Sequence, residues 1–435
     1  MRRAQSLAVT LLATALAALA VAACGSSSSS TSSASAGSAS STSSASSTST
    51  TSAGSSSTAT TSTWSPIVIG AAIDLSNTMK FFDGPAEAAA QLEVKKINAA
   101  GGVDGRKLEF LVENDQLNPA RTRAVALDLT TNQKANVLWV TCDVDWATPS
   151  TEVGISKGLL TVAPCIGTDQ MGPKRFGSQG KLAFSYGNVA QDEGAALAQL
   201  AIKNGVKTAD VVTDKSIVYE VNDCQAFTKR FTELGGKVVA QDTFTQGDHT
   251  VGSVASKVNG QKADAVALCT YSSPAGDLAA FVSDLRSLGN QTAIYGPWSI
   301  DGSFWLPKGA KISNNIWYVT YASVYGDDPS SAVRSLEQQL NASGNPPATG
   351  GFVTGAAAID GIVAAIKQAG GSTDGTKLAS IMQNFQNLPT ISGDVSFSSS
   401  LHSVYGRSYR IIHVVNGKPQ YVGSIKASSP ANIGQ

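Results

Sequence analysis

Cysteine is the residue type with the most distinct chemistry in this 435-residue chain, and it occurs five times. Cys24 stands alone near the N-terminus, at the end of an apolar segment that closes with "VAAC". Cys142, Cys165, Cys224 and Cys269 follow at wide spacings. An even number of cysteines beyond a leader segment favours disulfide bonds, which persist in oxidising compartments. We therefore predict two disulfides, and a separate role for Cys24.

The N-terminal segment has the pattern of a secretory signal peptide. Arg2 and Arg3 precede the apolar run "LAVTLLATALAALAVAA", which ends in small residues directly before Cys24. A membrane-spanning helix would need about 20 apolar residues with polar flanks on both sides. "VAAC" instead fits the lipobox of bacterial lipoproteins, in which the cysteine is acylated and becomes the new N-terminus. We predict a signal peptide over 1–23 and lipidation of Cys24; the alternative is a plain signal peptide with an incidental cysteine.

The segment 24–64 consists almost entirely of Ser, Thr, Ala and Gly. Such a composition buries too little apolar surface to offset the entropy of ordering the chain. Roughly 39 flexible residues have a root-mean-square reach of about 35 Å. We predict a disordered tether that holds the rest of the protein near the extracytoplasmic face of the bacterial cell membrane.

Motifs for catalysis or metal binding are missing from the sequence. The three histidines, His249, His402 and His413, have no neighbours at metal-ligand spacing. Neither a G-x-S-x-G elbow nor a P-loop occurs, and no dinucleotide-binding fingerprint follows "IVIGAAI". The 32 basic and 32 acidic residues balance, so no net charge steers the chain to nucleic acid. We expect a protein that is not an enzyme and has no metal, cofactor or nucleic-acid partner.

Short apolar runs alternate with helical periodicity from Ile67 onward. The first series predicts strands at 67–73, 106–115, 135–141 and 159–165, and helices at 84–102 and 119–133. In the first helix, Pro85 would occupy the first turn and Gly101-Gly102 would end it. The second series predicts helices at 193–205, 223–236 and 274–289, and strands at 209–214, 237–244, 263–270 and 292–297.

The C-terminal part should add two long helices, at 349–370 and 376–385, and a hairpin at 409–423 with Asn416-Gly417 as its turn. Strands that alternate with helices predict βαβ units and parallel sheets. The fold class is therefore α/β, with two doubly wound lobes. Ligands of such sheets bind outside the carboxyl ends of the strands, so we expect the site in the cleft between the lobes.

The stretch "KINAAGGVDGRKLEFLVENDQLNPARTRAVALDL" resembles the leucine/isoleucine/valine-binding proteins, which are extracytoplasmic receptors of ABC importers with the type I periplasmic-binding-protein fold. "GAAIDLS", "TVAPCIGT", "DLRSLG" and "IYGP" fall at matching places, so the resemblance covers about 66–425. It implies a three-stranded hinge, with crossovers near 186–190, 318–324 and 404–410. Lobe 1 would then contain 66–187 plus 322–405, and lobe 2 would contain 188–320 plus 406–435.

The resemblance also implies a set of ligand-binding residues. The family holds the ligand's α-carboxylate with small polar residues and backbone N–H groups after the third strand, where this chain has the acidic residues of "TCDVDWAT". Where the family has an acidic partner for the ligand's ammonium group, this chain has a tryptophan. The candidate residues are Phe82, Asp143, Asp145, Ile166, Gly167, Thr168, Tyr219, Tyr271, Trp298 and Phe352.

Five of these candidates are aromatic, and together they would form a slot with aromatic walls. An aromatic face can hold a cation without a carboxylate. Asp143 or Asp145 could bind an amine or a hydroxyl group. The alternatives are that the aromatic residues belong to the core and that the aspartates lie in a solvated loop or cap a helix. The two altered polar contacts make an ordinary branched-chain amino acid a doubtful ligand.

We predict the disulfide pairs Cys142–Cys165 in lobe 1 and Cys224–Cys269 in lobe 2. Cys142 and Cys165 end consecutive strands whose carboxyl ends meet at one edge. Cys269 ends a strand of the other lobe, and Cys224 opens a helix at the same edge. Each pair stays within one lobe, so neither would lock the hinge.

These features together predict a monomeric substrate-binding lipoprotein that captures a small molecule, an amino acid or a related organic compound. Its partners would be the permease subunits and cytoplasmic ATPases of an ABC importer. The alternative is a receptor that senses a ligand and signals to a membrane partner without transport.

Overall fold

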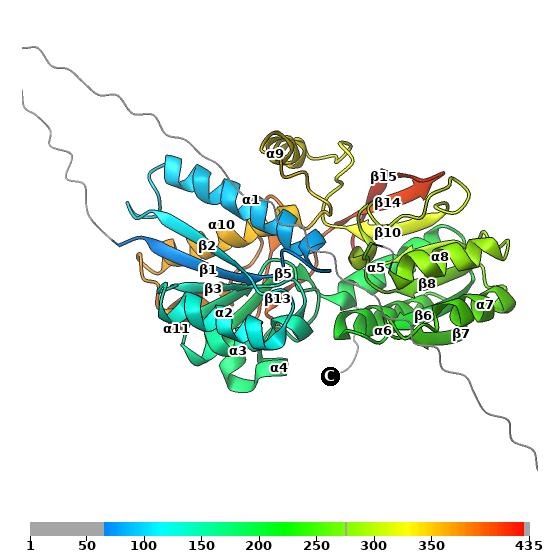
Figure 1. Cartoon of the computed structure of the whole chain (residues 1–435), viewed down its shortest axis with the longest axis horizontal. Coiled ribbons are helices and arrows are strands. Elements are labelled where there is room, and N and C mark those ends of the chain that lie inside the picture. The colour runs from blue at the N-terminus through cyan, green and yellow to red at the C-terminus, as the bar shows by residue number, and fades with distance from the viewer. Residues whose placement is uncertain (1–64, 275, 430–435) are drawn as a thin grey trace, which may run out of the picture. The chain divides into compact units, whose positions relative to one another are not determined.

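The computed structural model describes residues 65–274 and 276–429. The predicted signal peptide, Cys24 and the tether lie outside the described residues. The described chain forms two lobes, each built around one β-sheet (Figure 1). We call the lobe of the six-stranded sheet lobe 1 and the lobe of the seven-stranded sheet lobe 2.

Lobe 1 contains a parallel sheet with the strand order β13-β5-β4-β3-β1-β2. Its central strands are apolar runs that are buried on both faces, as expected when helices cover both sides of a parallel sheet. The strands are β1 (Ile67–Ile73), β2 (Leu108–Asn114), β3 (Val137–Val140), β4 (Leu160–Ala163), β5 (Ala183–Asn188) and β13 (Ser403–Val404). The helices of this part are α1 (Lys80–Ala99), α2 (Pro119–Thr131), α3 (Val144–Ser156), α4 (Pro173–Phe176), η1 (Gly177–Leu182), α10 (Phe352–Gln368) and α11 (Gly375–Met382), and β11 (Leu388–Thr390) pairs with β12 (Gly393–Val395).

Lobe 2 contains a mixed sheet with the order β15-β14-β10-β9-β8-β6-β7. The strands are β6 (Thr208–Asp214), β7 (Lys237–Phe244), β8 (Ala265–Cys269), β9 (Ala293–Gly296), β10 (Ile316–Thr320), β14 (Tyr409–Val415) and β15 (Lys418–Ile425). The helices are α5 (Ala190–Lys203), α6 (Val218–Glu233), α7 (Val251–Gln261), α8 (Asp277–Ser287) and η2 (Trp298–Ile300), and α9 (Ser331–Ala342) follows β10. The hairpin β14–β15 turns at Asn416 and Gly417, which have the positive φ angles of 53° and 77° that a type I′ turn requires.

The chain passes from one sheet to the other three times: after β5, after β10 and after β13. The predicted α/β fold of two doubly wound lobes with a three-stranded hinge is therefore confirmed. One apolar cluster continues from lobe 2 into lobe 1, since it contains Phe227 and Trp298 as well as Phe82, Cys142 and Cys165. The lobes are packed against each other in this structure.

The helices differ from their predicted limits at several places. Helix α1 begins at Lys80, so Pro85 is its sixth residue instead of lying in its first turn. Proline has no N–H to donate to the carbonyl four residues earlier. That carbonyl, of Phe81, accepts the hydroxyl of Thr349 at 2.9 Å instead. The sequence analysis did not predict α3, α7 and α9, and α11 has only eight residues where a long helix was expected.

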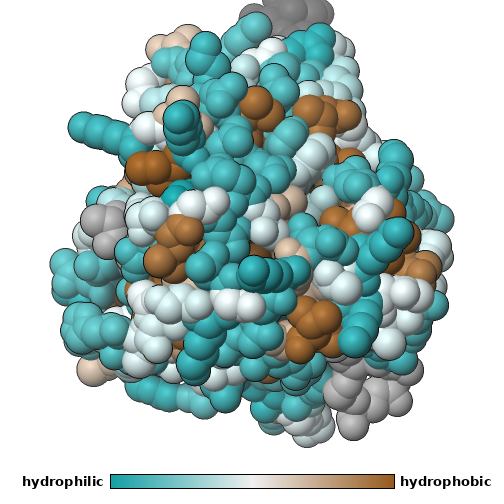
Figure 2. Space-filling view, turned by 90° about the vertical axis from the view of Figure 1, so that its right-hand side faces the viewer, coloured by the Kyte–Doolittle hydropathy of each residue, from teal (hydrophilic) through white to brown (hydrophobic). Residues whose placement is uncertain are grey.

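The surface is mainly polar where lobe 2 ends. Figure 2 shows this face, at the right-hand side of Figure 1, as hydrophilic residues with separate apolar ones between them. In the described part of the chain, no helix combines the length and the hydropathy needed to cross a bilayer. This face offers no broad apolar patch of the kind that a permanent subunit contact buries.

Candidate ligand-binding site

A small pocket, with about 30 Å³ of space for the centres of water-sized molecules, lies between the two lobes. Its walls follow the carboxyl ends of strands β3 and β4 in lobe 1 and of β6, β8 and β9 in lobe 2. This is the position at which doubly wound sheets bind ligands. Lobe 1 contributes Met79, Phe82, Cys142, Asp143, Trp146 and Gly167; lobe 2 contributes Ile217, Tyr219, Tyr271, Trp298 and Ser299.

Aromatic rings from the two lobes meet across this pocket. Phe82 of α1 packs edge-on against Trp298 of η2, with ring centroids 5.0 Å apart. Trp146 of α3 packs edge-on against Tyr271, which follows β8, at 5.7 Å. Trp298 also lies 4.8 Å from Tyr321, just after β10. The walls are therefore largely aromatic, and two of these ring pairs exist because the lobes are close together.

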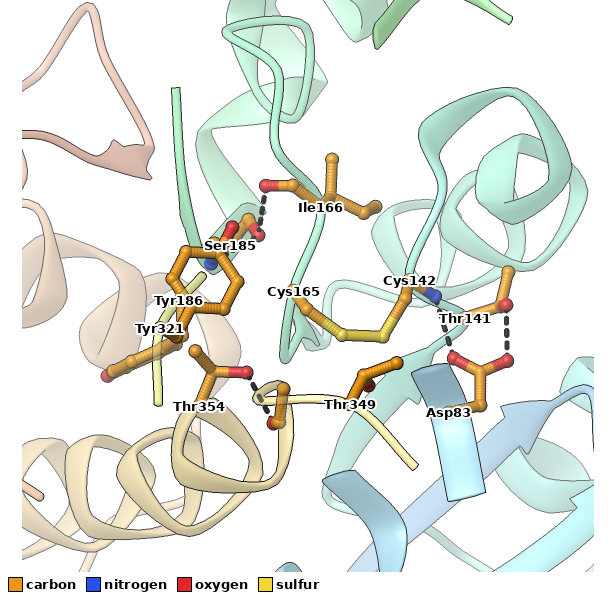
Figure 3. The surroundings of a disulfide bond; sticks show 12 residues. Asp83, Thr141, Cys142, Cys165, Ile166, Ser185, Tyr186, Tyr321, Thr349 and Thr354 are labelled. Atoms are coloured by element: carbon orange, nitrogen blue, oxygen red, sulfur yellow. Dashed lines mark hydrogen bonds between the residues drawn. A yellow bond between two sulfur atoms is a disulfide. The ribbon is translucent and has the colours of Figure 1, made fainter. Parts of the chain in front are cut away.

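A disulfide and a buried carboxylate fix the lobe 1 side of the pocket (Figure 3). The Cys142–Cys165 bond joins the segments that follow β3 and β4. Asp83 of α1 accepts the backbone N–H of Cys142 at 2.8 Å and the hydroxyl of Thr141 at 2.5 Å. Burial raises the pKa of Asp83 well above its ordinary value, and the Thr141 hydrogen bond opposes that rise. The second predicted pair, Cys224–Cys269, joins α6 to the end of β8 within lobe 2, so both predicted pairs occur.

Asp143 is the N-cap residue of α3 and also lines the pocket. Its Oδ1 accepts the backbone N–H groups of Asp145 at 2.9 Å and Trp146 at 3.3 Å, while its Oδ2 accepts no hydrogen bond from the described residues. Only 4% of the residue is exposed. Burial, followed by repulsion from Asp145, raises the pKa of Asp143 to about 7. Asp143 thus caps a helix and also lines the pocket.

The other three candidates after β3 and β4 lie outside the pocket lining. Asp145 accepts the backbone N–H of Val218 in lobe 2 and pairs with Arg175. The hydroxyl of Thr168 accepts the side-chain amide of Asn222 in lobe 2 at 3.1 Å. The carbonyl of Ile166 accepts the hydroxyl of Ser185 at 2.8 Å (Figure 3). Two of the three thus connect the lobes, and the third fixes a loop within lobe 1.

Phe352 is the first residue of α10 and is fully buried in the cluster that both lobes share. It does not line the pocket. The structure thus brings six of the ten candidates to one cavity: Phe82, Asp143, Gly167, Tyr219, Tyr271 and Trp298.

The sequence analysis did not assign Met79, Trp146, Ile217 and Ser299 to the site. Trp146 lies in the quoted loop "TCDVDWAT", so its position next to Asp143 was a usable signal. Met79 and Ile217 are apolar residues just before helices, which sequence patterns do not distinguish from core residues. Ser299 lies in a short 3₁₀ turn that has no sequence signature.

Acidic side chains are buried behind the lobe 2 wall of the pocket. Glu193 of α5 accepts the backbone N–H of Trp298. Glu220 and Asp223 of α6 are fully buried, and none of their four carboxylate oxygens has a hydrogen-bond partner among the described residues. Burial raises the pKa of all three carboxyls. Repulsion from Asp214 and Glu193 adds to the rise at Glu220, and repulsion from Glu193 and Glu220 adds to it at Asp223. Among the residues described, no group of His, Cys, Asp and Glu has an arrangement that could hold a metal ion.

Comparison with known proteins identifies the class. The model of the periplasmic binding protein family matches residues 66–418, and the chain belongs to this family. It is an extracytoplasmic solute-binding protein rather than an enzyme, as the sequence predicted.

The particular relatives support the suspected resemblance. The Leu/Ile/Val-binding protein BraC3 of Rhizobium johnstonii is 25% identical over 336 residues, which are 77% of this chain and 88% of that protein. LivJ of Streptococcus pneumoniae, solved with isoleucine, superposes with a TM-score of 0.72 at 19% identity, over 83% of this chain and 99% of its own. A solute-binding protein of Rhodopseudomonas palustris, solved with 3,4-dihydroxybenzoic acid, gives 0.70 at 18% identity, over 84% and 98%. The resemblance to the Leu/Ile/Val-binding proteins is thereby confirmed.

Proposed function

We propose that this protein captures a small organic molecule between its lobes and delivers it to the permease of an ABC importer while a lipid at Cys24 anchors it to the membrane. The observation that carries the proposal is the pocket itself, because its walls come almost equally from two lobes that three chain segments connect. A hinge of this kind lets each lobe move as a rigid body. With the lobes packed as they are in this structure, the pocket leaves only about 30 Å³ for the centres of water-sized molecules, so a small compound would enter while the lobes are apart.

The named ligands of related proteins are small compounds. LivJ was solved with isoleucine and the Rhodopseudomonas protein with a dihydroxybenzoic acid. Both compounds have either a short branched chain or a single ring. We infer a ligand of similar size here, first docked on Phe82 and the loop that contains Gly167, and then covered by Tyr219, Tyr271 and Trp298. Closure requires only that the ligand binds the closed form better than the open form.

A thermal-shift screen of small organic compounds tests ligand capture. A ligand that binds only the folded protein stabilises it by about 2.7 kcal/mol at a hundredfold excess over Kd. Small-angle scattering should show compaction with each hit. Trp298→Ala should weaken binding and reduce compaction at equal ligand concentration. Trp317→Ala is the matched control, because Trp317 stacks on His413 within lobe 2, away from the pocket. Equal affinity of Trp298→Ala and wild type would remove Trp298 from the site.

Transport is tested in cells. Deleting the gene should abolish uptake of the identified ligand at low concentration, and a plasmid copy should restore it. Unchanged uptake together with a lost transcriptional response would favour the ligand sensor over the transport receptor. Cys24→Ala should release the protein into the soluble extracytoplasmic fraction. If that variant remains in the membrane pellet, the apolar segment spans the membrane and the lipid anchor is refuted.

A further inference from the structure

We propose that the ligand is a small organic cation, an ammonium compound without a carboxylate, and that its ammonium group lies against Asp143. The inference rests on the proposed function, because it names the ligand class of the same pocket. It follows from three features: the charge of the pocket lining, its aromatic faces, and the unpartnered acids behind it.

Among the described residues that line the pocket, Asp143 has the single charged side chain, and none is a lysine or an arginine. Oδ1 of Asp143 is used by the helix cap, and Oδ2 is left for a ligand. An ammonium group can donate to this oxygen, and hydrogen bonds to a charged group are among the stronger ones in proteins. A ligand carboxylate would face the same oxygen and be repelled by it.

Aromatic side chains line the same pocket as this carboxylate. Trp146 is three residues after Asp143, and its ring meets that of Tyr271 across the pocket. Phe82 and Trp298 form a second such pair. Aromatic faces attract cations through their quadrupole, most strongly where water is excluded. They also accept the apolar body of the ligand, so the lining suits an ammonium group attached to a hydrocarbon.

Glu220 adds an independent indication. It is fully buried, and within the described part of the chain neither of its carboxylate oxygens has a hydrogen-bond partner. Ser299 lines the pocket next to Glu220. Its hydroxyl donates to the carbonyl of Thr270 at 2.8 Å, so this proton is not available to the Glu220 carboxylate. Unpaired buried carboxyls are unfavourable unless a positive charge or a proton compensates them. A cation in the adjacent pocket would supply that compensation.

The nearby arginines do not supply the positive charge that would compensate the buried carboxyls. Arg175 pairs with Asp145. Arg407 is buried and donates to the side chain of Asn188 and the carbonyl of Tyr186, and its guanidinium lies over the Tyr321 ring. Neither makes a hydrogen bond or an ion pair with a carboxylate that lines the pocket. The interior around the pocket therefore has an excess of acidic groups.

The proton balance of binding distinguishes a cation from an acid. The ionisable groups around Asp143 are Asp145 on its own helix, Arg175, Glu220 of α6 and Tyr271 after β8. Burial and Asp145 hold the pKa of Asp143 near 7, so an empty site is partly protonated at neutral pH. A bound ammonium favours the carboxylate and releases that proton. A bound carboxylate favours the protonated form and takes up a proton.

The experiment uses two matched series: leucine, 3-methylbutylamine and 4-methylpentanoate; and phenylalanine, phenethylamine and 3-phenylpropanoate. Titration calorimetry at pH 7 in buffers of different ionisation enthalpy gives both Kd and the protons exchanged. We expect one of the amines to bind at least roughly tenfold more tightly than its matching acid and amino acid, with proton release and with affinity that rises from pH 6 to pH 8.

Asp143→Asn should lower the affinity for the amine by at least roughly tenfold. Its amide retains a carbonyl oxygen for the helix cap, and a melting curve checks the fold. Asp374→Asn is the matched control, since Asp374 caps α11 at an exposed position away from the pocket. Tighter binding of an acid or an amino acid, proton uptake, or failure of both amines to bind at millimolar concentration would overturn the inference. Compaction with an acid or an amino acid would overturn it while leaving the proposed function intact.

Discussion

The carboxylate of Asp145 in lobe 1 accepts a hydrogen bond from the backbone N–H of Val218 in lobe 2 at 2.8 Å. Val218 is the first residue of α6, and the N-cap residue of that helix, Ile217, offers no side-chain oxygen. Asp145 therefore caps a helix of the opposite lobe and places a negative charge at its N-terminus. Because this contact joins the two lobes, separating them would break it, and we expect it to stabilise the closed form.

Asp145→Ala should weaken ligand binding about tenfold, because losing a cap costs about 1–2 kcal/mol and the loss falls on the closed form alone. Calorimetry gives the affinity, and small-angle scattering gives the fraction closed at saturation. Asp374→Ala is the control, because Asp374 caps α11 within lobe 1 through the N–H of Lys377 at 2.8 Å. The control should lower the melting temperature and leave affinity unchanged. Equal affinities of Asp145→Ala and wild type would contradict a role in closure.

Gly167→Ala should hold the lobes apart. Gly167 follows β4 in lobe 1, and a Cβ at this position would overlap Cε2 and Cδ2 of the Tyr219 ring in lobe 2. The open form avoids this clash, so we expect an intact fold with weaker binding and less compaction. Gly260→Ala on α7, where a Cβ meets nothing within 4 Å, is the control.

A second substitution tests that mechanism. Tyr219→Ala removes the ring atoms that a Cβ at 167 would meet. Adding Gly167→Ala to Tyr219→Ala should therefore change compaction little further. If Gly167→Ala reduces compaction equally in both backgrounds, the Tyr219 ring is not the obstacle.

The sequence predicted the parts of the fold that depend on local patterns. "IVIGAAI" forms a fully buried strand, and Asn416-Gly417 makes the hairpin turn. Both were predictable because an apolar run and a turn dipeptide favour these structures through their own residue types, without distant contacts. Helix α3 was missed because Pro149 lies within it. Helix α1 starts earlier than expected, and the Phe81 carbonyl that Pro85 leaves free accepts the hydroxyl of Thr349, 268 residues away in the sequence.

The candidate site was predictable at the strand ends and less so elsewhere. Asp143, Tyr271 and Trp298 follow strands, and the topology of parallel sheets brings such positions together. Asp145 is two residues from Asp143, yet it bonds the other lobe instead of lining the pocket. Sequence spacing alone does not separate these roles, since the first turn of α3 rotates the two side chains to different directions.

The two disulfides should affect function differently. Cys142 lines the pocket, whereas Cys224–Cys269 joins α6 to β8 behind it. Replacing Cys142 and Cys165 together with alanine should lower both the free energy of unfolding, by about 3 kcal/mol, and the affinity for ligand. Replacing Cys224 and Cys269 should lower the free energy of unfolding by a similar amount and leave affinity nearly unchanged. Urea denaturation and calorimetry measure the two effects; equal losses of affinity would refute this division.

The stability of the protein should fall as pH rises from about 5 to about 8. Burial raises the pKa of Asp143 to about 7 and the pKa of Glu220 well above its ordinary value. In this range the folded protein keeps protons that the unfolded chain, with ordinary carboxyl pKa values near 4, has already lost. Stability from such groups is fully present below the unfolded pKa and is lost as pH rises through the folded pKa, at up to about 1.4 kcal/mol per pH unit for each group.

Two glutamates on the same helix provide the test. Glu220→Gln should reduce the slope of unfolding free energy against pH, because the amide is neutral at every pH and so binds no proton in either the folded or the unfolded state. Glu233→Gln is its control on α6: Glu233 is exposed to solvent, and hydrogen bonding to Lys229 lowers its pKa. That variant should keep the wild-type slope above pH 5, where Glu233 is already ionised in both states. Urea denaturation at several pH values measures the slopes. The prediction is contradicted if the wild-type free energy of unfolding stays constant or rises with pH over this range. Equal slopes in the two variants would likewise show that Glu220 does not keep its proton in the folded protein.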